Sequence, residues 1–434
     1  MNGKVLIIAY CFPPMQVIGS QRPYGIAKYL KYYGWEPIVL TVKHPGNSPA
    51  GIKIIPTEYS DRLAKIKKIF GFKAGDGMHQ QLGIPVAKDF GYPTLKSKAI
   101  KAFREIVAFP DNEIGWLRHA MASATNLIRL AKIDAMISTS APVTAHLIAS
   151  RLKKKFKIPW IADLRDLWTQ NHYYNKSKPL RFFEQVLELN TLSGANALVT
   201  ISSALAEELA KLHTGKEIQC ITNGFDPDEF EEIRATVPNK FSITHTGRLY
   251  NGKRDPVMLL KTLAKLIDAN KIKRDMVEVS FYGPAEKWLF DDIKKFNLDG
   301  IVRVHGDIPR SDAIKKQSQS QLLLLLLWNE SREKGVYTGK LFEYLGARRP
   351  ILAIGGGNSI VKNLLLGTSS GDFIETEKQL ASSIMRYYDE FVLSGLVKYN
   401  GNTSIEKYSF QSIAFEYAKL LNAITFHTGH KSNL

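Results

Sequence analysis

Two series of short β-branched or leucine-rich segments alternate with longer amphipathic segments, and this alternation constrains the fold more than any other feature. The first series occupies residues 5–10, 37–42, 135–140, 160–163, 197–201 and 218–222. The second occupies residues 242–246, 277–282, 302–305, 322–328, 351–354 and 372–375. Strands that alternate with helices of about 10–15 residues are typical of βαβ units in a parallel sheet. The sequence therefore predicts an α/β protein with two such sheets.

The chain is long enough for two domains. It has 434 residues, and an ordinary domain has about 150. The turn-forming pairs Asn223-Gly224 and Asp226-Pro227 separate the two series. We expect a first domain over residues 1–235 and a second over residues 236–405. A final helix near 409–426 has an apolar stripe, which must pack on another part of the protein.

Composition excludes several classes of protein. A content of 44% hydrophobic and 23% charged residues is that of a globular protein. Two cysteines are too few for a disulfide framework, and no apolar run approaches the roughly 20 residues that span a bilayer. These features predict a cytoplasmic protein. The net charge of +18 favours an anionic partner: a phosphorylated substrate, a phospholipid surface or nucleic acid.

The segment 61–105 departs from the alternating pattern because it is strongly basic. Lysine and arginine outnumber acidic residues, and apolar residues are interleaved with them. A basic amphipathic helix on an anionic membrane would have this composition. A solvated charged face over an ordinary core would have it too. The membrane alternative places the protein at the inner face of the plasma membrane.

Candidate site residues in the first half follow two predicted strands. Gly19 lies in a loop that leads into a helix, where a residue without a side chain lets an anion approach the backbone. Asp163 and Asp166 flank Arg165 at the end of another strand. One carboxylate could act as a base or orient an acceptor hydroxyl while Arg165 fixes the other. A purely structural Asp–Arg pair is the alternative.

Candidate site residues in the second half begin after its first predicted strand. Gly247, Arg248 and Lys253 lie in one loop, and a guanidinium with an ammonium suits a diphosphate. An ordinary surface loop is the alternative.

A second cluster follows the leucine-rich strand. Thr338 could cap a helix that begins near Gly339 and Lys340, whose amides would then face a phosphate. Glu343, one turn further on, could accept hydrogen bonds from a ribose diol, or could simply favour a helix N-terminus. The histidines and cysteines show no metal-site spacing, so we predict neither a metal nor a cofactor.

These motifs, in this order, resemble glycosyltransferase family 4. The resemblance is carried by the segments 12–22, 139–142, 163–168, 222–224, 246–253 and 340–344. It implies the GT-B fold, which has two facing Rossmann-like domains. It also implies that the final residues 406–434 return to the first domain. It also implies transfer of a sugar from a nucleotide-diphosphate donor to an acceptor hydroxyl, with retention and without a metal. A lipid-linked or polysaccharide precursor is the expected acceptor.

The resemblance also implies roles for individual residues. Arg248 and Lys253 would hold the diphosphate and stabilise the departing group. Gly339 and Lys340, at the helix start, would bind the phosphates. Glu343 would bind the ribose. Gly19 would lie beneath the donor. The family commonly has a second glutamate eight residues before this one, but Gly335 occupies that position and Glu333 lies two residues earlier. The alternatives are a nucleotide-sugar epimerase of the same fold, a non-catalytic homologue and a basic nucleic-acid-binding protein, although no stacking stripe for nucleic acid is evident.

Overall fold

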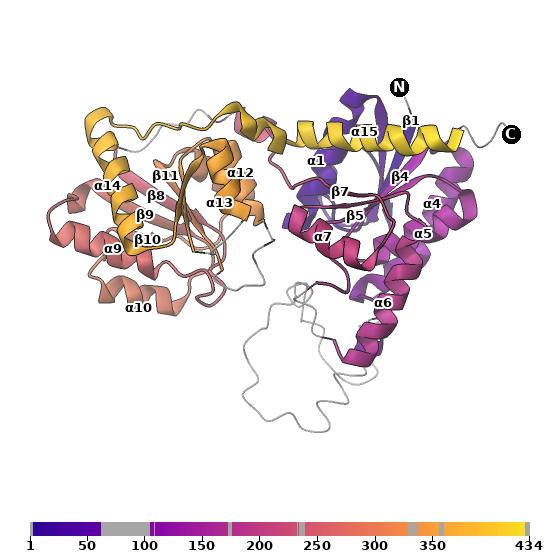
Figure 1. Cartoon of the computed structure of the whole chain (residues 1–434), viewed down its shortest axis with the longest axis horizontal. Helices are drawn as coiled ribbons and strands as arrows, with labels where there is room; N and C mark the ends of the chain where they lie inside the picture. The colour runs from indigo at the N-terminus through magenta and orange to yellow at the C-terminus, as the bar shows by residue number, and fades with distance from the viewer. Residues whose placement is uncertain are drawn as a thin grey trace, which may run out of the picture. The chain divides into compact units, whose positions relative to one another are not determined.

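The computed structural model describes residues 3–61, 105–107, 109–171, 176–231, 233, 239–328, 335, 337–355 and 360–429. The chain forms two compact units (Figure 1). Unit 1 comprises Met1–Thr222 and Ile413–Leu434, and unit 2 comprises Asn223–Ser412. The expected basic segment 61–105 lies outside the described residues except at its two ends.

Both predicted domain boundaries, after residues 235 and 405, fall inside unit 2. The reason is a pairing between the two chain segments that leave and re-enter this unit. The amide of Phe225 donates to the carbonyl of Tyr408 at 3.0 Å, and the amide of Phe410 donates to the carbonyl of Phe225 at 2.8 Å. The Phe225 side chain is buried in the core of unit 2. Backbone pairing and this buried ring thus extend the second unit beyond its predicted limits.

The sheet of unit 1 is parallel and has the strand order β3-β2-β1-β4-β5-β6-β7. Its strands are β1 (Gly3–Ala9), β2 (Trp35–Val42), β3 (Lys53–Thr57), β4 (Ala135–Thr139), β5 (Trp160–Leu164), β6 (Ala197–Thr200) and β7 (Ile218–Cys220). The helices are α1 (Gln21–Leu30), α4 (Leu117–Leu130), α5 (Thr144–Phe156), α6 (Lys178–Leu192) and α7 (Ser203–Leu212), with α15 (Phe410–Gly429) added from the end of the chain.

Strand β3 is the one strand of this sheet that the sequence pattern missed. It contains Pro56, which has no amide to donate to a neighbouring strand and is therefore tolerated only at an edge. The strand is indeed the edge of the sheet and pairs only with β2. Three of its five residues are half-buried or buried in a pattern that is too weak to mark a strand.

The sheet of unit 2 is also parallel and has the order β10-β9-β8-β11-β12-β13. Its strands are β8 (Phe241–Thr246), β9 (Val277–Tyr282), β10 (Val302–Val304), β11 (Leu322–Leu326), β12 (Ile351–Ile354) and β13 (Gly371–Ile374). The helices are α8 (Asp228–Glu231), α9 (Val257–Asp268), α10 (Lys287–Lys295), α11 (Arg310–Ser318), α12 (Gly339–Ala347), α13 (Ile360–Thr368) and α14 (Glu377–Ser394).

The α/β prediction is thus confirmed in both halves of the chain. Strand β11 consists of five leucines, all buried, because helices cover both faces of a parallel sheet. In each sheet the strands run the same way, so the residues that follow them gather at one edge, where doubly wound folds bind ligands. No helix among the described residues is long and apolar enough to cross a membrane.

The last helix, α15, packs on unit 1 through its apolar stripe (Figure 1). Ile413 and Tyr417 are buried. The indole nitrogen of Trp35 in β2 donates to the side chain of Asn422 at 3.1 Å. Phe415, which the sequence pattern also places in the stripe, is 46% exposed and lies 5.3 Å from the Tyr33 ring. The helix therefore covers an apolar face of unit 1 that the earlier part of the chain leaves open.

Candidate functional site

The loop after β8 has an unusual backbone. Gly247, Tyr250, Asn251 and Gly252 all have positive φ, at +103°, +56°, +53° and +80°. Non-glycine residues rarely adopt this conformation, and such strain clusters at ligand sites. The loop joins the end of the first strand of unit 2 to α9, at the edge of the sheet where parallel strands end.

Lys340 and Gly247, both predicted site residues, are in contact. Lys340 is the second residue of α12, and its side chain extends over the α-carbon of Gly247. A β-carbon at Gly247 would collide with the Cε and Nζ atoms of Lys340. Glycine is therefore required here both by its positive φ and by the space that the lysine occupies. Burial, followed by repulsion from Arg254, lowers the pKa of Lys340 to about 7.

Arg254 is the second cation of this site, and the sequence analysis did not single it out. Its guanidinium lies 4.9 Å from the centre of the Tyr250 ring, and its Nε atom is buried with no hydrogen-bond partner in the part of the chain that the structure describes. Burial lowers the pKa of Arg254. Among the described residues, no carboxylate lies within ion-pairing distance of Arg254 or Lys340. Two desolvated cations therefore lie near each other at the start of a helix, an arrangement that attracts an anion.

Arg248 and Lys253, predicted to hold a diphosphate, lie on the same loop with exposed side chains. The Lys253 ammonium lies 4.6 Å from the centre of the Trp328 ring. The sequence showed five basic or glycine positions in this loop but not which side chains are exposed. That depends on the left-handed turn between Tyr250 and Gly252, which directs consecutive side chains differently.

Thr338 occupies the N-cap position of α12, and Gly339 is its first residue. The hydroxyl of Thr338 makes no capping hydrogen bond, contrary to the prediction, and is buried without a partner among the described residues. The first amides of a helix have no partner within the helix. The start of α12 therefore offers an unbonded hydroxyl close to unpaired amides.

Glu343 lies one turn further along α12 and is held from two directions. The Nε of Arg310 donates to one carboxylate oxygen at 3.2 Å, and the Nε2 of Gln317 donates to the other at 3.3 Å. Arg310 also pairs with Glu229 of α8. Burial lowers the pKa of Arg310, whereas the hydrogen bond that Arg310 donates to Glu229 raises it, and the pKa is raised overall. The carboxylate of Glu343 is thus oriented and remains 18% exposed.

The sequence analysis missed Arg310 and Gln317. These residues lie seven positions apart on α11, which places them on one face of the helix. Gln317 also donates to the hydroxyl of Thr246 at the end of β8, at 2.9 Å. A spacing of seven between polar residues was a usable signal, but the position of α11 beside α12 was not readable from the sequence.

Asp163 of β5, predicted as a catalytic carboxylate, is fully buried in an ion pair. The Nε of Arg22 donates to it at 2.9 Å, Nη2 donates at 2.9 Å, and the hydroxyl of Thr139 donates at 2.8 Å. Although burial alone would raise its pKa, Arg22 holds the pKa of this carboxyl below the ordinary value. Both oxygens are occupied inside unit 1, so this carboxylate serves the structure and is not available as a base.

Arg22 itself connects several segments of unit 1. Its guanidinium also donates to the carbonyls of Ile221 and Thr222 and to the hydroxyl of Tyr417 in α15. These residues come from the start, the middle and the end of the chain. The sequence motif marked Arg22 only as part of a loop, because its partners lie more than 100 positions away.

Asp166 is the other predicted carboxylate of unit 1. Arg165 donates to it through Nε at 3.0 Å and Nη2 at 2.8 Å, and the side chain of Asp166 remains 42% exposed. Gly19 lies beside the same guanidinium, because a β-carbon at Gly19 would come within 2.7 Å of an Arg165 nitrogen. Arg165 thus fixes one carboxylate, as one reading of the sequence proposed, and brings Gly19 and Asp166 into one cluster.

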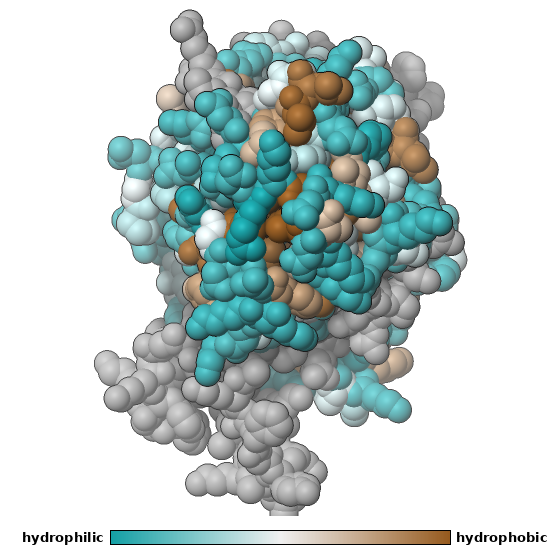
Figure 2. Space-filling view, turned by 90° about the vertical axis from the view of Figure 1, so that its left-hand side faces the viewer, coloured by the Kyte–Doolittle hydropathy of each residue, from teal (hydrophilic) through white to brown (hydrophobic). Residues whose placement is uncertain are grey.

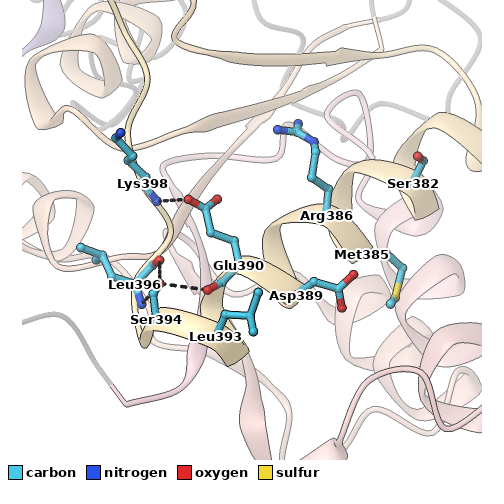
Figure 3. Close-up of a pocket in the computed structure, with 9 residues that line it drawn as sticks. All are labelled: Ser382, Met385, Arg386, Asp389, Glu390, Leu393, Ser394, Leu396 and Lys398. Carbon is cyan, nitrogen blue, oxygen red and sulfur yellow. Dashed lines mark hydrogen bonds between the residues drawn. The ribbon is translucent and has the colours of Figure 1, made fainter.

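A hollow on the surface of unit 2 lies away from these residues. It has a volume of about 910 Å³ and is lined by α14 and the segment that follows it. Figure 2 shows this side of unit 2, where hydrophobic side chains gather in a few places among hydrophilic ones. In the close-up, the carboxylates of Asp389 and Glu390 border the hollow, and Glu390 accepts a hydrogen bond from the amide of Lys398 (Figure 3). Carboxylates would repel a diphosphate, so this hollow does not suit one.

The described residues contain no group of three or more His, Cys, Asp or Glu side chains that could hold a metal ion. Gly335 is described, whereas Glu333 lies outside the described residues.

Residues 85–229 match the model of Glycosyltransferase Family 4. Several solved structures are similar in fold. The glycosyltransferase from Rickettsia africae ESF-5 is 15% identical over 98% of each chain, with a TM-score of 0.57. Sucrose-phosphate synthase from Thermosynechococcus elongatus is 11% identical over 97% of this chain and 99% of the other, also with a TM-score of 0.57. Anabaena HepE, solved in complex with UDP and glucose, is 13% identical over 97% of this chain and 100% of the other, with a TM-score of 0.57.

No curated protein sequence matches this chain. The structural likenesses establish the fold, which is that of the GT-B glycosyltransferases, over almost the whole chain. The family match covers part of unit 1 and the first residues of unit 2. Residues 85–229 thus match glycosyltransferase family 4, and the chain has the fold of the GT-B glycosyltransferases.

Proposed function

We propose that this protein is a glycosyltransferase that uses a nucleotide-diphosphate sugar as donor and binds the diphosphate at the start of α12. One observation carries the proposal: Lys340 and Arg254 lie near each other, desolvated, with no carboxylate of the described residues in ion-pairing distance. A diphosphate would supply the missing negative charge. The amides of the first turn of α12 and the aligned peptide dipoles add to this attraction.

Glu343 is the proposed ligand of the ribose. A carboxylate with a fixed orientation accepts hydrogen bonds from two neighbouring hydroxyls. Arg310 and Gln317 fix it, and it lies one turn after the cation that would hold the phosphates. Arg248 and Lys253, exposed on the loop after β8, are proposed to add positive charge around the diphosphate.

The proposed chemistry needs no metal ion. As the sugar departs, negative charge grows on the diphosphate, and fixed cations stabilise it more in the transition state than in the ground state. Lys340 and Arg254 are positioned before the ligand arrives, so little reorganisation is required. We propose retention at the anomeric carbon on the strength of the family match, and the NMR spectrum of the isolated product tests it directly.

The proposed acceptor is a hydroxyl of a lipid-linked or polysaccharide precursor. The net charge of +18 and the basic composition of segment 61–105 support an anionic surface as the place of reaction. A cytoplasmic location at the inner face of the plasma membrane would follow. Consumption of the donor in the absence of any acceptor would instead favour an epimerase or a hydrolase.

Binding of nucleotide diphosphates tests the proposal. Calorimetric titration with UDP, GDP and ADP, with and without EDTA, should show binding of at least one that EDTA does not weaken. Lys340→Gln should weaken that binding by roughly 10- to 100-fold, since hydrogen bonds to charged groups contribute about 1.5–3 kcal/mol. Lys362→Gln is the control, because Lys362 pairs with Glu375 on the surface of the same unit.

The proposal would be abandoned if no nucleotide diphosphate bound, or if the Lys340 variant bound as tightly as the original protein. A thermal-shift screen of nucleotide sugars then names the donor, because a ligand that binds only the folded state raises the melting temperature.

A further inference from the structure

Helix α6 of unit 1 directs its carboxylates inward. Glu184 and Glu188 lie four positions apart and are 1% and 0% exposed. Glu184 accepts from the indole nitrogen of Trp168 at 2.8 Å and pairs with Lys176 at 2.8 Å. Glu188 accepts from the amide of Thr169 at 3.0 Å. Buried carboxylates require such partners, which explains why this polar face is turned toward the protein.

The outer face of α6 is apolar as a consequence. Phe182 and Phe183 are 62% and 63% exposed, and Val186 and Leu189 lie further along the same side at 42% and 37%. The two phenyl rings contact each other edge to face, with centroids 5.9 Å apart. A surface helix normally shows the opposite arrangement, with apolar residues toward the core. We call the four residues Phe182, Phe183, Val186 and Leu189 the α6 outer face.

Basic groups lie at both ends of the α6 outer face. Lys178 and Arg181 are exposed in the first turn of the helix, and Arg181 donates to the carbonyl of Thr169 at 3.0 Å. Beyond the last turn, Lys216 donates to the carbonyl of Ala195 at 2.8 Å, and Lys153 donates to Asn196 at 2.9 Å. Apart from burial, repulsion by Lys157 and Lys216 lowers the pKa of Lys153, so these lysines form one cluster.

The acidic residues of α6 itself are buried and partnered, so they add no negative charge to its outer face. Glu208 of α7 pairs with Lys211. An apolar strip between two sets of cations is complementary to a bilayer with anionic headgroups: the rings enter the region between headgroups and acyl chains, and the lysines contact the headgroups. Exposed aromatic side chains of this kind are costly in water and mark an interaction surface.

We propose that the α6 outer face, with its flanking lysines and arginine, docks unit 1 onto an anionic phospholipid bilayer. This inference is drawn from the contacts and exposure of α6 and its flanking residues, and it involves no residue of the proposed donor site. It rests on the proposed function only in one respect: a docked unit 1 could reach a lipid-linked acceptor in the bilayer.

Vesicle flotation of the full chain tests the proposal. Vesicles of phosphatidylcholine and phosphatidylglycerol in a 3:1 ratio should carry the protein upward in low salt, and pure phosphatidylcholine vesicles should carry much less. Phe182→Ser together with Phe183→Ser should lower the partition coefficient by about tenfold or more, since each buried ring contributes strongly to membrane affinity. The matched control is Leu130→Ser with Phe426→Ser, which changes two side chains of unit 1 that are 80% and 78% exposed.

A second readout reports insertion directly. Phe183→Trp should be quenched by brominated lipids in anionic vesicles, whereas Leu130→Trp should not. Equal flotation of the serine variant and the original protein would overturn the proposal. A second outcome would also overturn it: the original protein does not float with the vesicles, and light scattering shows a dimer that becomes a monomer in the serine variant. The α6 outer face would then join two copies of the chain. UDP titration of the same variants without lipid shows separately whether the donor site has failed.

Discussion

The charged residues at the strand ends of the two sheets differ in how their charges are balanced. In unit 1, Arg22 pairs with Asp163 and Arg165 pairs with Asp166, so each cation has its carboxylate. In unit 2, Lys340 and Arg254 have no such partner among the described residues. The first arrangement stabilises the folded chain by itself. The second arrangement stabilises the folded chain fully only when an anion binds. The first is therefore a structural cluster of charges, and the second has the properties of a ligand-binding cluster.

The largest expected effect comes from Asp163→Asn. Removing one charge of a buried pair leaves the guanidinium of Arg22 uncompensated, and such changes cost about 3–5 kcal/mol of unfolding free energy. Urea unfolding of the variant measures the loss. Asp166→Asn is the matched comparison, because its pair is partly exposed and contributes about 0–1 kcal/mol. Equal losses in the two variants would contradict the structural role of Asp163.

The second expected effect concerns pH and ligand binding. The pKa of Lys340 is about 7 in the free protein, and a bound diphosphate favours the charged amine. Above pH 7, UDP binding should therefore take up about one proton and weaken by about tenfold per pH unit. Calorimetry at pH 8.5 in buffers of different ionisation enthalpy measures the uptake.

In that experiment Lys340→Gln should abolish the proton uptake. An uptake that persists in this variant would assign the proton to another group, and the contrast between the two clusters would lose its main support.

The third expected effect is a gain in stability. Lys340→Met should raise the unfolding free energy of the ligand-free protein by about 1–2 kcal/mol, because it removes a desolvated cation. The sign follows from linkage: the unfolded chain has the ordinary lysine pKa of 10.5, so the folded state is penalised for the charge. The gain should be full below pH 7 and disappear as the pH approaches 10.5. Thermal unfolding at pH 6 and pH 10 would show it, and a loss of stability at pH 6 would contradict it.

The smallest expected effect comes from Arg310→Gln. Arg310 is a positioning residue that orients Glu343, so the variant should raise the Michaelis constant for the donor by up to about tenfold, corresponding to roughly 1 kcal/mol. The turnover number should change less. Arg310→Lys should restore part of the affinity if positive charge matters as well as geometry. A fall in turnover with an unchanged Michaelis constant would exclude this role.

Sequence patterns predicted the strands well because buried parallel strands are continuous apolar runs, as β11 shows. They missed β3, whose proline and half-exposed residues lack that pattern. Sequence patterns marked the loop of Gly247 and the helix start of Lys340 as two separate clusters, and only the family resemblance assigned both to one donor site. The structure brings these two residues into contact.

Side-chain partners from distant segments were not readable in this way. Asp163 was one of two carboxylates predicted as catalytic, and the sequence pattern showed no sign of its ion pair because Arg22, its partner, lies 141 positions earlier. The burial of Arg254 depends on left-handed turns within its own loop. The phenylalanines of α6 would be expected in the core, but Trp168 and Thr169 attract the glutamates inward instead. In each case the deciding contact joins elements whose arrangement the sequence pattern does not specify.

Helix α15 has a consequence for the order in which a newly synthesised chain can fold. Unit 2 is one continuous stretch, whereas unit 1 contains the beginning of the chain and needs its last residues to complete its core. Until α15 has been synthesised, Tyr417 cannot contact Arg22, and the apolar face that α15 covers is exposed. Unit 1 therefore reaches its final packing only after the whole of unit 2 has been synthesised, because α15 follows unit 2 in the chain.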